Sequence, residues 1–454
     1  MRELKEFSIY GLWGERNYRL IVTDGRLIMV GENGSGKTTV LRILYYTLAK
    51  KWGQLVKEDF ERIKIVIDDD IKEFTKEQLG KPEEYMVDMG ADMFSRIPFR
   101  NRHSYIDGPR DKCMADEVLE YIELLEYPDG MFDEAIEKLE KIALIVPDSI
   151  KEISEWLKAN LVLPILYMPT YRRIEKEPGS YNSEYDPTRR NRRRFRTKNI
   201  ENINMEVSHI GMRDVNEAIQ NLIYIIREEY ARSSSQLNLS CFKGILTQDF
   251  EMVDSIPEEY INPECIEMIF NSVSENELLD ADKNQIKEKL ISVIEKKADY
   301  DEYDKIVIYY YNMLINRYEG LKKIEEKLEH FFYACNQYLS SKEFVYKPNE
   351  FEYAILVQSR DGSKKKMSIE QLSSGEKQIV ALFSYIYLFV TEPCMVIIDE
   401  PELSLSVTWQ EKILEDIVQS ENCNNLIVAT QSPFVYDNSL RKYAHAIEEF
   451  LILE

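Results

Sequence analysis

A glycine-rich loop between an expected strand and an expected helix restricts most strongly how this chain can fold. Residues 31–39 read Gly-Glu-Asn-Gly-Ser-Gly-Lys-Thr-Thr. Residues 26–30 before it are a β-rich run, and residues 37–50 carry apolar side chains at helical spacing. Glycines let backbone N–H groups close around a phosphate, and the helix start adds a positive dipole end. The pattern predicts a phosphate-binding loop in an α/β fold, with an ordinary glycine-rich turn as the alternative.

Two side chains of this loop have an expected role in nucleotide binding. The Lys37 ammonium group is expected to reach the β- and γ-phosphates, and the Thr38 hydroxyl group to bind Mg²⁺. The candidate binding residues of the loop are Gly31, Asn33, Gly34, Ser35, Gly36, Lys37, Thr38 and Thr39.

A second segment is an apolar run at residues 395–398 that ends in two acids, Asp399 and Glu400. Asp399 is expected to hold Mg²⁺ at the carboxyl end of a buried strand, and Glu400 to polarise an attacking water. The alternative is a strand capped by acids at a surface turn. Three roles stay open for Glu402: guiding the water, contacting an opposite subunit, or being solvated.

Two further segments complete the set. Residues 372–376 read Leu-Ser-Ser-Gly-Glu and precede an apolar helical run, so the N–H groups at that helix start predict an anion site. A routine capping box is the alternative, because Glu376 follows Ser373 by three residues. The candidate residues are Ser373, Ser374, Gly375 and Glu376. The fourth segment, residues 429–433, reads Ala-Thr-Gln-Ser-Pro and places Gln431 after another expected strand.

In their order along the chain, these four segments resemble the ABC-type ATPase heads of the SMC, Rad50, RecF and OLD families. The resemblance covers residues 1–170 and 340–454. It implies an α/β P-loop head split by a mainly helical insertion, with ATP and Mg²⁺ as cofactors. It also implies that the Ser373 segment of one subunit binds the γ-phosphate held by residues 31–38 of a second subunit. The expected assembly is then a homodimer or a higher oligomer joined head to head.

The resemblance implies an ATPase with Lys37, Glu400 and Gln431 as catalytic residues. Many relatives have histidine at the position of Gln431. A neutral amide can donate a hydrogen bond to the γ-phosphate but carries no charge, so hydrolysis is expected to be slow. The expected domains are an N-terminal lobe (1–170), an arginine-rich loop with a helical insertion (171–340) and a C-terminal lobe (341–454).

Local patterns agree with this division. Helical spacing dominates residues 211–338, most clearly at 283–296 and 303–338. The β-rich runs outside this insertion are residues 4–10, 18–23, 26–30, 62–67, 161–169 and 351–358. Trp13, near the first expected hairpin, is expected to pack in the core, with contact to an adenine ring as the alternative.

Residues 402–410 and 430–434 point to a narrower group, and residues 169–175 share the likeness. They resemble the OLD-like AAA ATPases of bacterial anti-phage defence, as in the Septu and PARIS systems. The implied function is a sensor and scaffold that controls a separate effector, expected to be a nuclease. The chain itself is not expected to be a nuclease, because it contains no HNH pattern and no TOPRIM region after residue 433. The alternative function is a DNA-repair ATPase of the SMC, RecF or Rad50 type.

Charge is distributed unevenly along the chain. The formal net charge is −23, yet residues 189–196 contain six arginines. Three interpretations of Arg189–Arg196 remain open: a solvated loop, a contact with an acidic partner such as a phage protein or a neighbouring subunit, and a nucleic-acid site. The sequence also lacks a long apolar run, a signal peptide and a CxxC pair, which favours a cytoplasmic protein without membrane spans.

Overall fold

The computed structural model describes residues 2–88, 112–114, 147–170, 205–206, 211–252, 255–273, 280–296, 300–359, 362–390 and 392–452. The chain divides into two compact units. The first consists of residues 1–211 and 373–454, and the second of residues 212–372.

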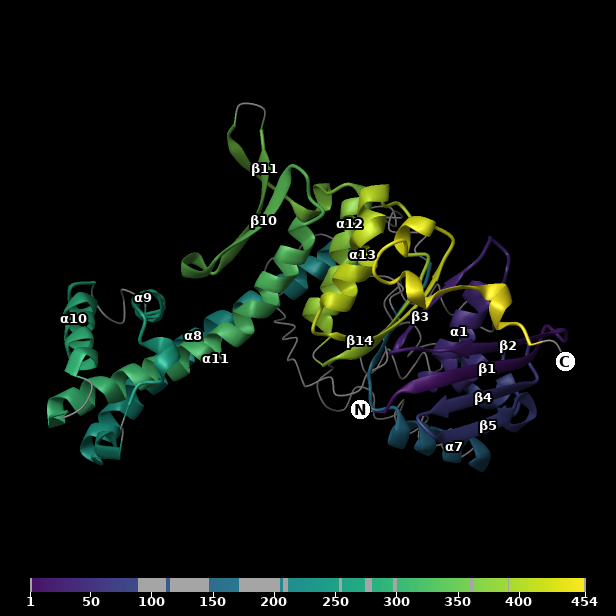
Figure 1. Ribbon diagram of the computed structural model, residues 1–454, viewed down its shortest axis with the longest axis horizontal. Helices are drawn as coiled ribbons and strands as arrows, with labels where there is room; N and C mark the ends of the chain where they lie inside the picture. The colour runs from purple at the N-terminus through teal and green to yellow at the C-terminus, as the bar shows by residue number, and fades with distance from the viewer. Residues whose placement is uncertain are drawn as a thin grey trace. The chain divides into compact units, whose positions relative to one another are not determined.

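A six-stranded parallel sheet forms the centre of the first unit (Figure 1). Its strand order is β15-β3-β14-β13-β8-β9. The strands are β3 (Arg26–Val30), β8 (Ile165–Met168), β9 (Met205–Glu206), β13 (Cys394–Asp399), β14 (Cys423–Thr430) and β15 (Ala444–Ala446). Every residue of β13 is buried, as expected for a parallel strand that is covered on both faces. The sheet therefore brings the ends of β3, β13 and β14 to one edge.

The first unit also contains a four-stranded antiparallel sheet with the strand order β2-β1-β4-β5. Its strands are β1 (Leu4–Leu12), β2 (Arg16–Ile21), β4 (Arg62–Ile67) and β5 (Asp70–Thr75). A short pair, β6 (Met86–Asp88) with β7 (Lys112–Met114), is also present. The longer helices of this unit are α1 (Lys37–Leu48), α7 (Asp148–Asn160), α12 (Ser374–Ser384) and α13 (Val407–Gln419), and α2 (Trp52–Leu55) is a single turn.

Alternate residues of the parallel strands face two different layers. Leu27, Met395, Ile397 and Ile427 belong to a buried cluster with α1 and the antiparallel sheet. Ile398, from the other face of β13, lines a small cavity with Gln378 and Leu382 of α12 and with Met168. Since side chains alternate between the two faces of a strand, α1 and α12 cover opposite faces of this sheet.

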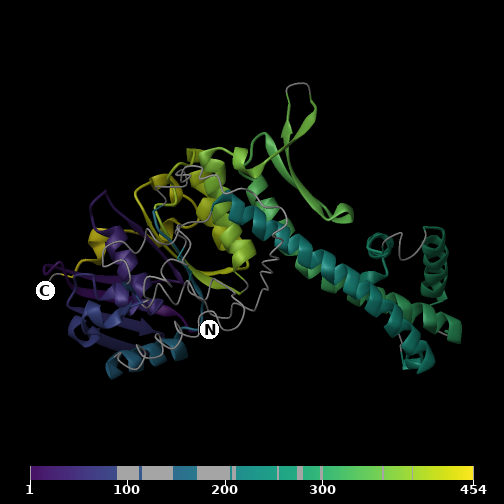
Figure 2. The same cartoon turned by 180° about the vertical axis from the view of Figure 1, so that it is seen from behind.

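The second unit contains two long helices, α8 (Met212–Leu246) and α11 (Glu302–Asn336), which lie side by side in both views (Figures 1 and 2). Two shorter helices, α9 (Pro263–Asn271) and α10 (Asp280–Lys296), share a hydrophobic cluster with α11. An antiparallel sheet of β10 (Lys342–Lys347), β11 (Glu352–Gln358) and β12 (Lys364–Met367) follows, and the 3-10 turn η7 (Ile369–Gln371) ends the unit.

Most elements expected from local patterns are confirmed. The strand at 62–67 has the expected bounds, and the apolar run at 161–169 contains β8. The helical runs at 283–296 and 303–338 correspond to α10 and α11. The three-lobe division stays a prediction, and Arg189–Arg196 lies outside the described residues. Within the described ranges, none of the helices combines the length and apolarity needed to cross a bilayer.

Candidate functional site: the strand ends of the parallel sheet

The glycine-rich loop connects β3 to α1, as the sequence predicts. Gly34 and Gly36 have φ angles of 82° and 100°, a left-handed conformation that favours glycine. Gly36 is the N-cap of α1, and a Cβ atom there would lie 2.9 Å from Cη2 of Trp13. A Cβ atom on Gly31 would lie 2.9 Å from Oγ of Ser35, a buried oxygen without a hydrogen-bond partner in the described structure. Backbone geometry and packing therefore both require glycine here.

Lys37 lies in the first turn of α1 and is only 4% exposed. Its Nζ atom donates hydrogen bonds to the carbonyl oxygens of Gly31 at 2.7 Å and Glu32 at 2.9 Å. The ammonium group is thus held against the backbone at the start of the loop. Carbonyl contacts of this kind can be exchanged for phosphate oxygens, which are stronger acceptors for a charged donor.

Asp399 meets the loop from the end of β13. Its Oδ2 atom accepts a hydrogen bond from Oγ1 of Thr38 at 2.8 Å and another from Oγ1 of Thr170. Its Oδ1 atom is buried and has no hydrogen-bond partner in the part of the chain that the structure describes. A carboxylate oxygen buried without a partner is costly. Hydroxyl and carboxylate oxygens are the ligands that Mg²⁺ prefers, so these residues fit the expected metal.

Thr170 was not among the candidate site residues. It follows β8, and β8 pairs with β13 in parallel, so the ends of the two strands are neighbours. Two sequence signals bore on it: its position directly after the apolar run at 161–169, and the likeness of residues 169–175 to the defence ATPases.

Glu400 follows Asp399 with a φ angle of 51°, which is unusual for a residue other than glycine. Its backbone N–H donates to the carbonyl oxygen of Ala429 at 2.8 Å. Its side chain is 8% exposed and lines the cavity with Gln378 and Leu405. Left-handed conformations at such residues cost about 1–3 kcal/mol and concentrate at functional sites. The burial of Asp399, Glu400 and Glu402 does not fit the alternative of solvated acids at a surface turn.

Gln431 stands directly after β14, which pairs with both β3 and β13. The backbone N–H of Gly31 donates to the carbonyl oxygen of Thr430 at 3.3 Å. The strand order therefore places Gln431 between the glycine-rich loop and the acidic pair. Its side chain is exposed.

Ser373 is the N-cap of α12, and Glu376 completes a capping box. The Ser373 N–H donates to Oε2 of Glu376 at 2.7 Å. The side chains of Ser373 and Ser374 are exposed, whereas Gly375 is buried against the next loop. A Cβ atom on Gly375 would lie 2.8 Å from the carbonyl oxygen of Ser404. The capping box is thus present, and it leaves two hydroxyl groups at the surface of the helix start.

The expected core position of Trp13 is wrong. The indole is 42% exposed and lies against Gly36. The Arg16 guanidinium group lies over the ring, 5.6 Å from its centroid. A flat aromatic surface therefore borders the loop, next to the place expected for a nucleotide.

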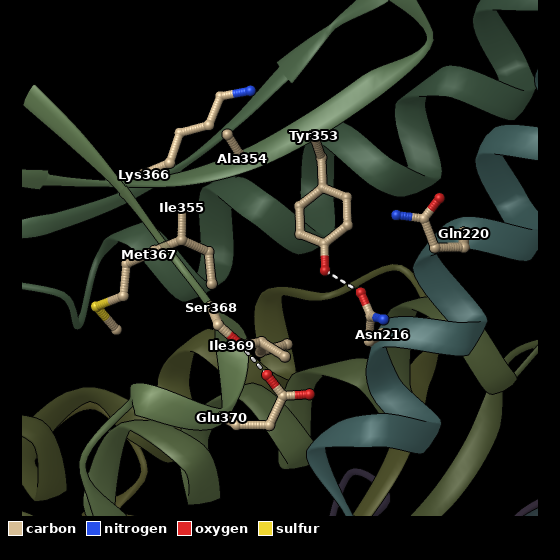
Figure 3. A pocket seen from close by; sticks show the side chains of 10 residues that line it. All are labelled: Asn216, Gln220, Tyr353, Ala354, Ile355, Lys366, Met367, Ser368, Ile369 and Glu370. Carbon is tan, nitrogen blue, oxygen red and sulfur yellow. Dashed lines mark hydrogen bonds between the residues drawn. The ribbon is translucent and has the colours of Figure 1, made fainter. Parts of the chain in front are cut away.

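A separate cavity of about 390 Å³ lies in the second unit (Figure 3). Tyr353, Ile355 and Met367 of the β-sheet line it together with Asn216 and Gln220 of α8. The Tyr353 hydroxyl donates to Oδ1 of Asn216, and burial raises the pKa of Tyr353 to about 12. None of the candidate nucleotide residues lines this cavity.

Comparison with known proteins adds one family and several relatives. Residues 269–437, less than half of the chain, match the family described as "AAA domain, putative AbiEii toxin, Type IV TA system". A Methanocaldococcus jannaschii protein described as an uncharacterized ABC transporter ATP-binding protein is 31% identical over 142 residues. The match covers 30% of this chain and 21% of that protein, so the chain spans only a small part of this relative.

Solved structures of Smc head domains are also similar. One, from Pyrococcus furiosus, has an extended coiled coil and is bound to the C-terminal domain of ScpA. It is 14% identical, with a TM-score of 0.32, and the match covers 96% of this chain and 91% of that one. Another, from Pyrococcus yayanosii, has a coiled coil and joint, with 14% identity, a TM-score of 0.28 and coverages of 96% and 93%.

The matched residues include the acidic end of β13 but not the glycine-rich loop between β3 and α1. The chain has a mixed α/β fold with a parallel sheet, consistent with the P-loop ATPase head that the sequence predicts.

Proposed function

We propose that the first unit binds and hydrolyses ATP with Mg²⁺. The observation that carries this proposal is the hydrogen bond from Thr38 to Asp399, whose second oxygen is buried and has no partner among the described residues. Mg²⁺ bound there would neutralise charge on the β- and γ-phosphates. Lys37 binds the same phosphates in place of its carbonyl contacts, and Trp13 offers its ring to the adenine.

In this proposal, Glu400 orients and polarises the attacking water from the end of β13. Gln431 donates its amide to the γ-phosphate without adding a charge. The neutral amide predicts slow turnover, so an ATP-bound state would persist.

Two heads are proposed to pair around ATP. Ser373 and Ser374 are exposed at the start of α12, which covers the face of the sheet opposite to α1. This arrangement supports an anion site that serves the P-loop of a second copy. ATP binding and assembly would then be a single event.

At the level of the cell, we propose a sensor and scaffold of an anti-phage defence system that controls a separate effector nuclease. The support is the likeness of residues 402–410 and 430–434 to defence ATPases, together with a matched family described for a Type IV TA system. A DNA-repair ATPase is the alternative. It predicts hydrolysis that is stimulated by DNA and suppressed by salt.

The test combines nucleotide binding with assembly size. Lys37→Ala is expected to lose binding of a fluorescent ATP analogue, while Lys57→Ala, an exposed lysine of the same unit, keeps it. Ser373→Arg is expected to bind ATP but to stay monomeric by light scattering, with Thr23→Arg as the matched control. Normal ATP binding by Lys37→Ala would rule out the proposed P-loop role. An ATP-dependent dimer of Ser373→Arg would rule out the shared site.

A further inference from the structure

A buried carboxylate connects the loop after β13 to the segment after β14. Glu402 is 7% exposed. Its Oε1 atom accepts hydrogen bonds from the backbone N–H groups of Gln431 at 2.9 Å and Ser432 at 3.2 Å. One oxygen therefore holds two successive amides, which fixes the backbone of Gln431 while its side chain stays exposed.

Gln410 of α13 makes a second connection between the same two segments. Its Oε1 atom accepts a hydrogen bond from Oγ of Ser432 at 2.7 Å. Its Nε2 atom donates to the carbonyl oxygen of Leu405 at 2.9 Å. We call Glu402, Gln410 and Ser432 the switch clamp.

The loop that carries Glu402 also contacts α12. Ser404 has a φ angle of 62°, and its carbonyl oxygen lies against Gly375. A Cβ atom on Gly375 would approach that oxygen to 2.8 Å. Residues 400–405 thus touch both the segment of Gln431 and the helix that begins at Ser373.

We propose that Glu402 is a positioning residue, which holds Gln431 at the distance and angle needed to meet a γ-phosphate. This inference rests on the proposed ATPase function. A neutral amide acts through a directional hydrogen bond, whereas a charged group would also attract phosphate at a distance. Because Gln431 is neutral, its contact with a phosphate depends strongly on the position of its backbone.

The competing role for Glu402 is a general base. Its Oε1 atom is engaged by two backbone amides, so a proton could be taken only by its Oε2 atom, which is buried and has no hydrogen-bond partner in the described structure. Glu400 directly follows Asp399 at the end of β13. Glu402→Gln separates the two roles, because an amide oxygen can accept the same two hydrogen bonds but cannot accept the proton of an attacking water.

The experiment measures ATP turnover and amide hydrogen exchange on the full chain. Glu402→Ala is expected to lower kcat about 10- to 100-fold with little change in KM, because small misplacements of catalytic groups have effects of this size. Its amides at 431 and 432 are expected to exchange about tenfold faster or more. Glu402→Gln is expected to keep at least about half of the turnover and most of the protection, because it retains both hydrogen bonds.

Glu415→Ala is the matched control. The Oε1 atom of Glu415, on α13, accepts the backbone N–H and the hydroxyl group of Ser439, so the variant frees a comparable amide outside the clamp. It is expected to leave kcat unchanged. Gln410→Ala, which removes only the second connection of the clamp, is expected to give a smaller loss than Glu402→Ala.

Two results would overturn the proposal. One is a Glu402→Gln variant as inactive as Glu400→Gln, which would make Glu402 a base. The other is a Glu402→Ala variant with wild-type exchange at residues 431 and 432. The exchange measurement does not depend on hydrolysis. A wild-type protein without ATPase activity would therefore count against the proposed function. Amide exchange at residues 431 and 432 would still test whether Glu402 holds this backbone.

Discussion

Two buried aspartates, one in each unit, show how similar burial can serve different ends. Asp304 of α11 is completely buried, and the Nζ atoms of Lys289 and Lys296 both contact its carboxylate. Asp399 is 2% exposed, yet its Oδ2 atom receives two hydroxyl groups and its Oδ1 atom nothing in the described structure. The first carboxylate has its counter-ions built in. The second has the arrangement expected of a carboxylate that binds a cation.

Loss of the charge at each position tests this difference, and Asp399→Asn is expected to have the largest effect. ATP hydrolysis should fall by about 10²- to 10³-fold, the size seen when a group that stabilises charge is removed. The melting temperature without nucleotide should not fall, because asparagine can still accept from Thr38 and an uncompensated charge has gone. A large drop in melting temperature would mean that Asp399 is a structural residue like Asp304.

Asp304→Asn is expected to give the opposite result. Charged hydrogen bonds contribute about 1.5–3 kcal/mol each when they are buried. The two lysines are partly exposed and can be hydrated again, so we expect a loss of about 1–3 kcal/mol in unfolding free energy. Urea unfolding measures this loss, and binding of an ATP analogue should be unchanged. Weakened nucleotide binding would show that the second unit supports the site energetically.

Trp13→Ala is expected to have an intermediate effect, which is limited to the affinity for the nucleotide. Stacking between an aromatic side chain and a base contributes about 1–3 kcal/mol, so the Kd for ATP should rise about 5- to 150-fold. Trp13→Phe keeps a ring and should recover most of the affinity. Equal affinity of Trp13→Ala for ATP and for inorganic triphosphate would support the stacking, and an unchanged Kd for ATP would exclude it.

Acid should remove the stabilisation by Asp304. Hydrogen bonding from Lys296 lowers the pKa of Asp304, in spite of burial, which acts in the other direction. Because the folded pKa lies below the unfolded one, the stabilisation is present above about pH 4 and is lost as the pH falls further. The difference in unfolding free energy between the wild type and Asp304→Asn should shrink over that range. A constant difference down to pH 2 would contradict the assignment.

The smallest effect is expected at Gln431. Gln431→His can add a positive charge, and charged hydrogen bonds are about twice as strong as neutral ones. A gain of about 0.5–1 kcal/mol in the transition state corresponds to a two- to fivefold rise in kcat. The rise should be larger below pH 6.5, where imidazole is protonated. An unchanged kcat would show that another step limits turnover.

Local pattern was sufficient for much of the fold. The strand–loop–helix at residues 26–48 and the strand before Asp399 follow from glycine positions, apolar runs and periodicity, which are short-range properties. Periodicity also predicted the long helix α11, whose N-cap is Asp301. The prediction for Trp13 was wrong because large aromatic side chains are usually buried, which buries much apolar area. The sequence does not show whether other residues cover this particular ring.

The sequence by itself determined which residues can cradle a phosphate, which strand ends in acids, and where glycine is required. Only the tertiary structure decided which of these groups meet. Thr170 reaches Asp399 because β8 pairs with β13, and Glu402 holds Gln431 because β13 pairs with β14. Strand pairing is set by burial of whole faces over long sequence separations, so no local pattern of residues contains it.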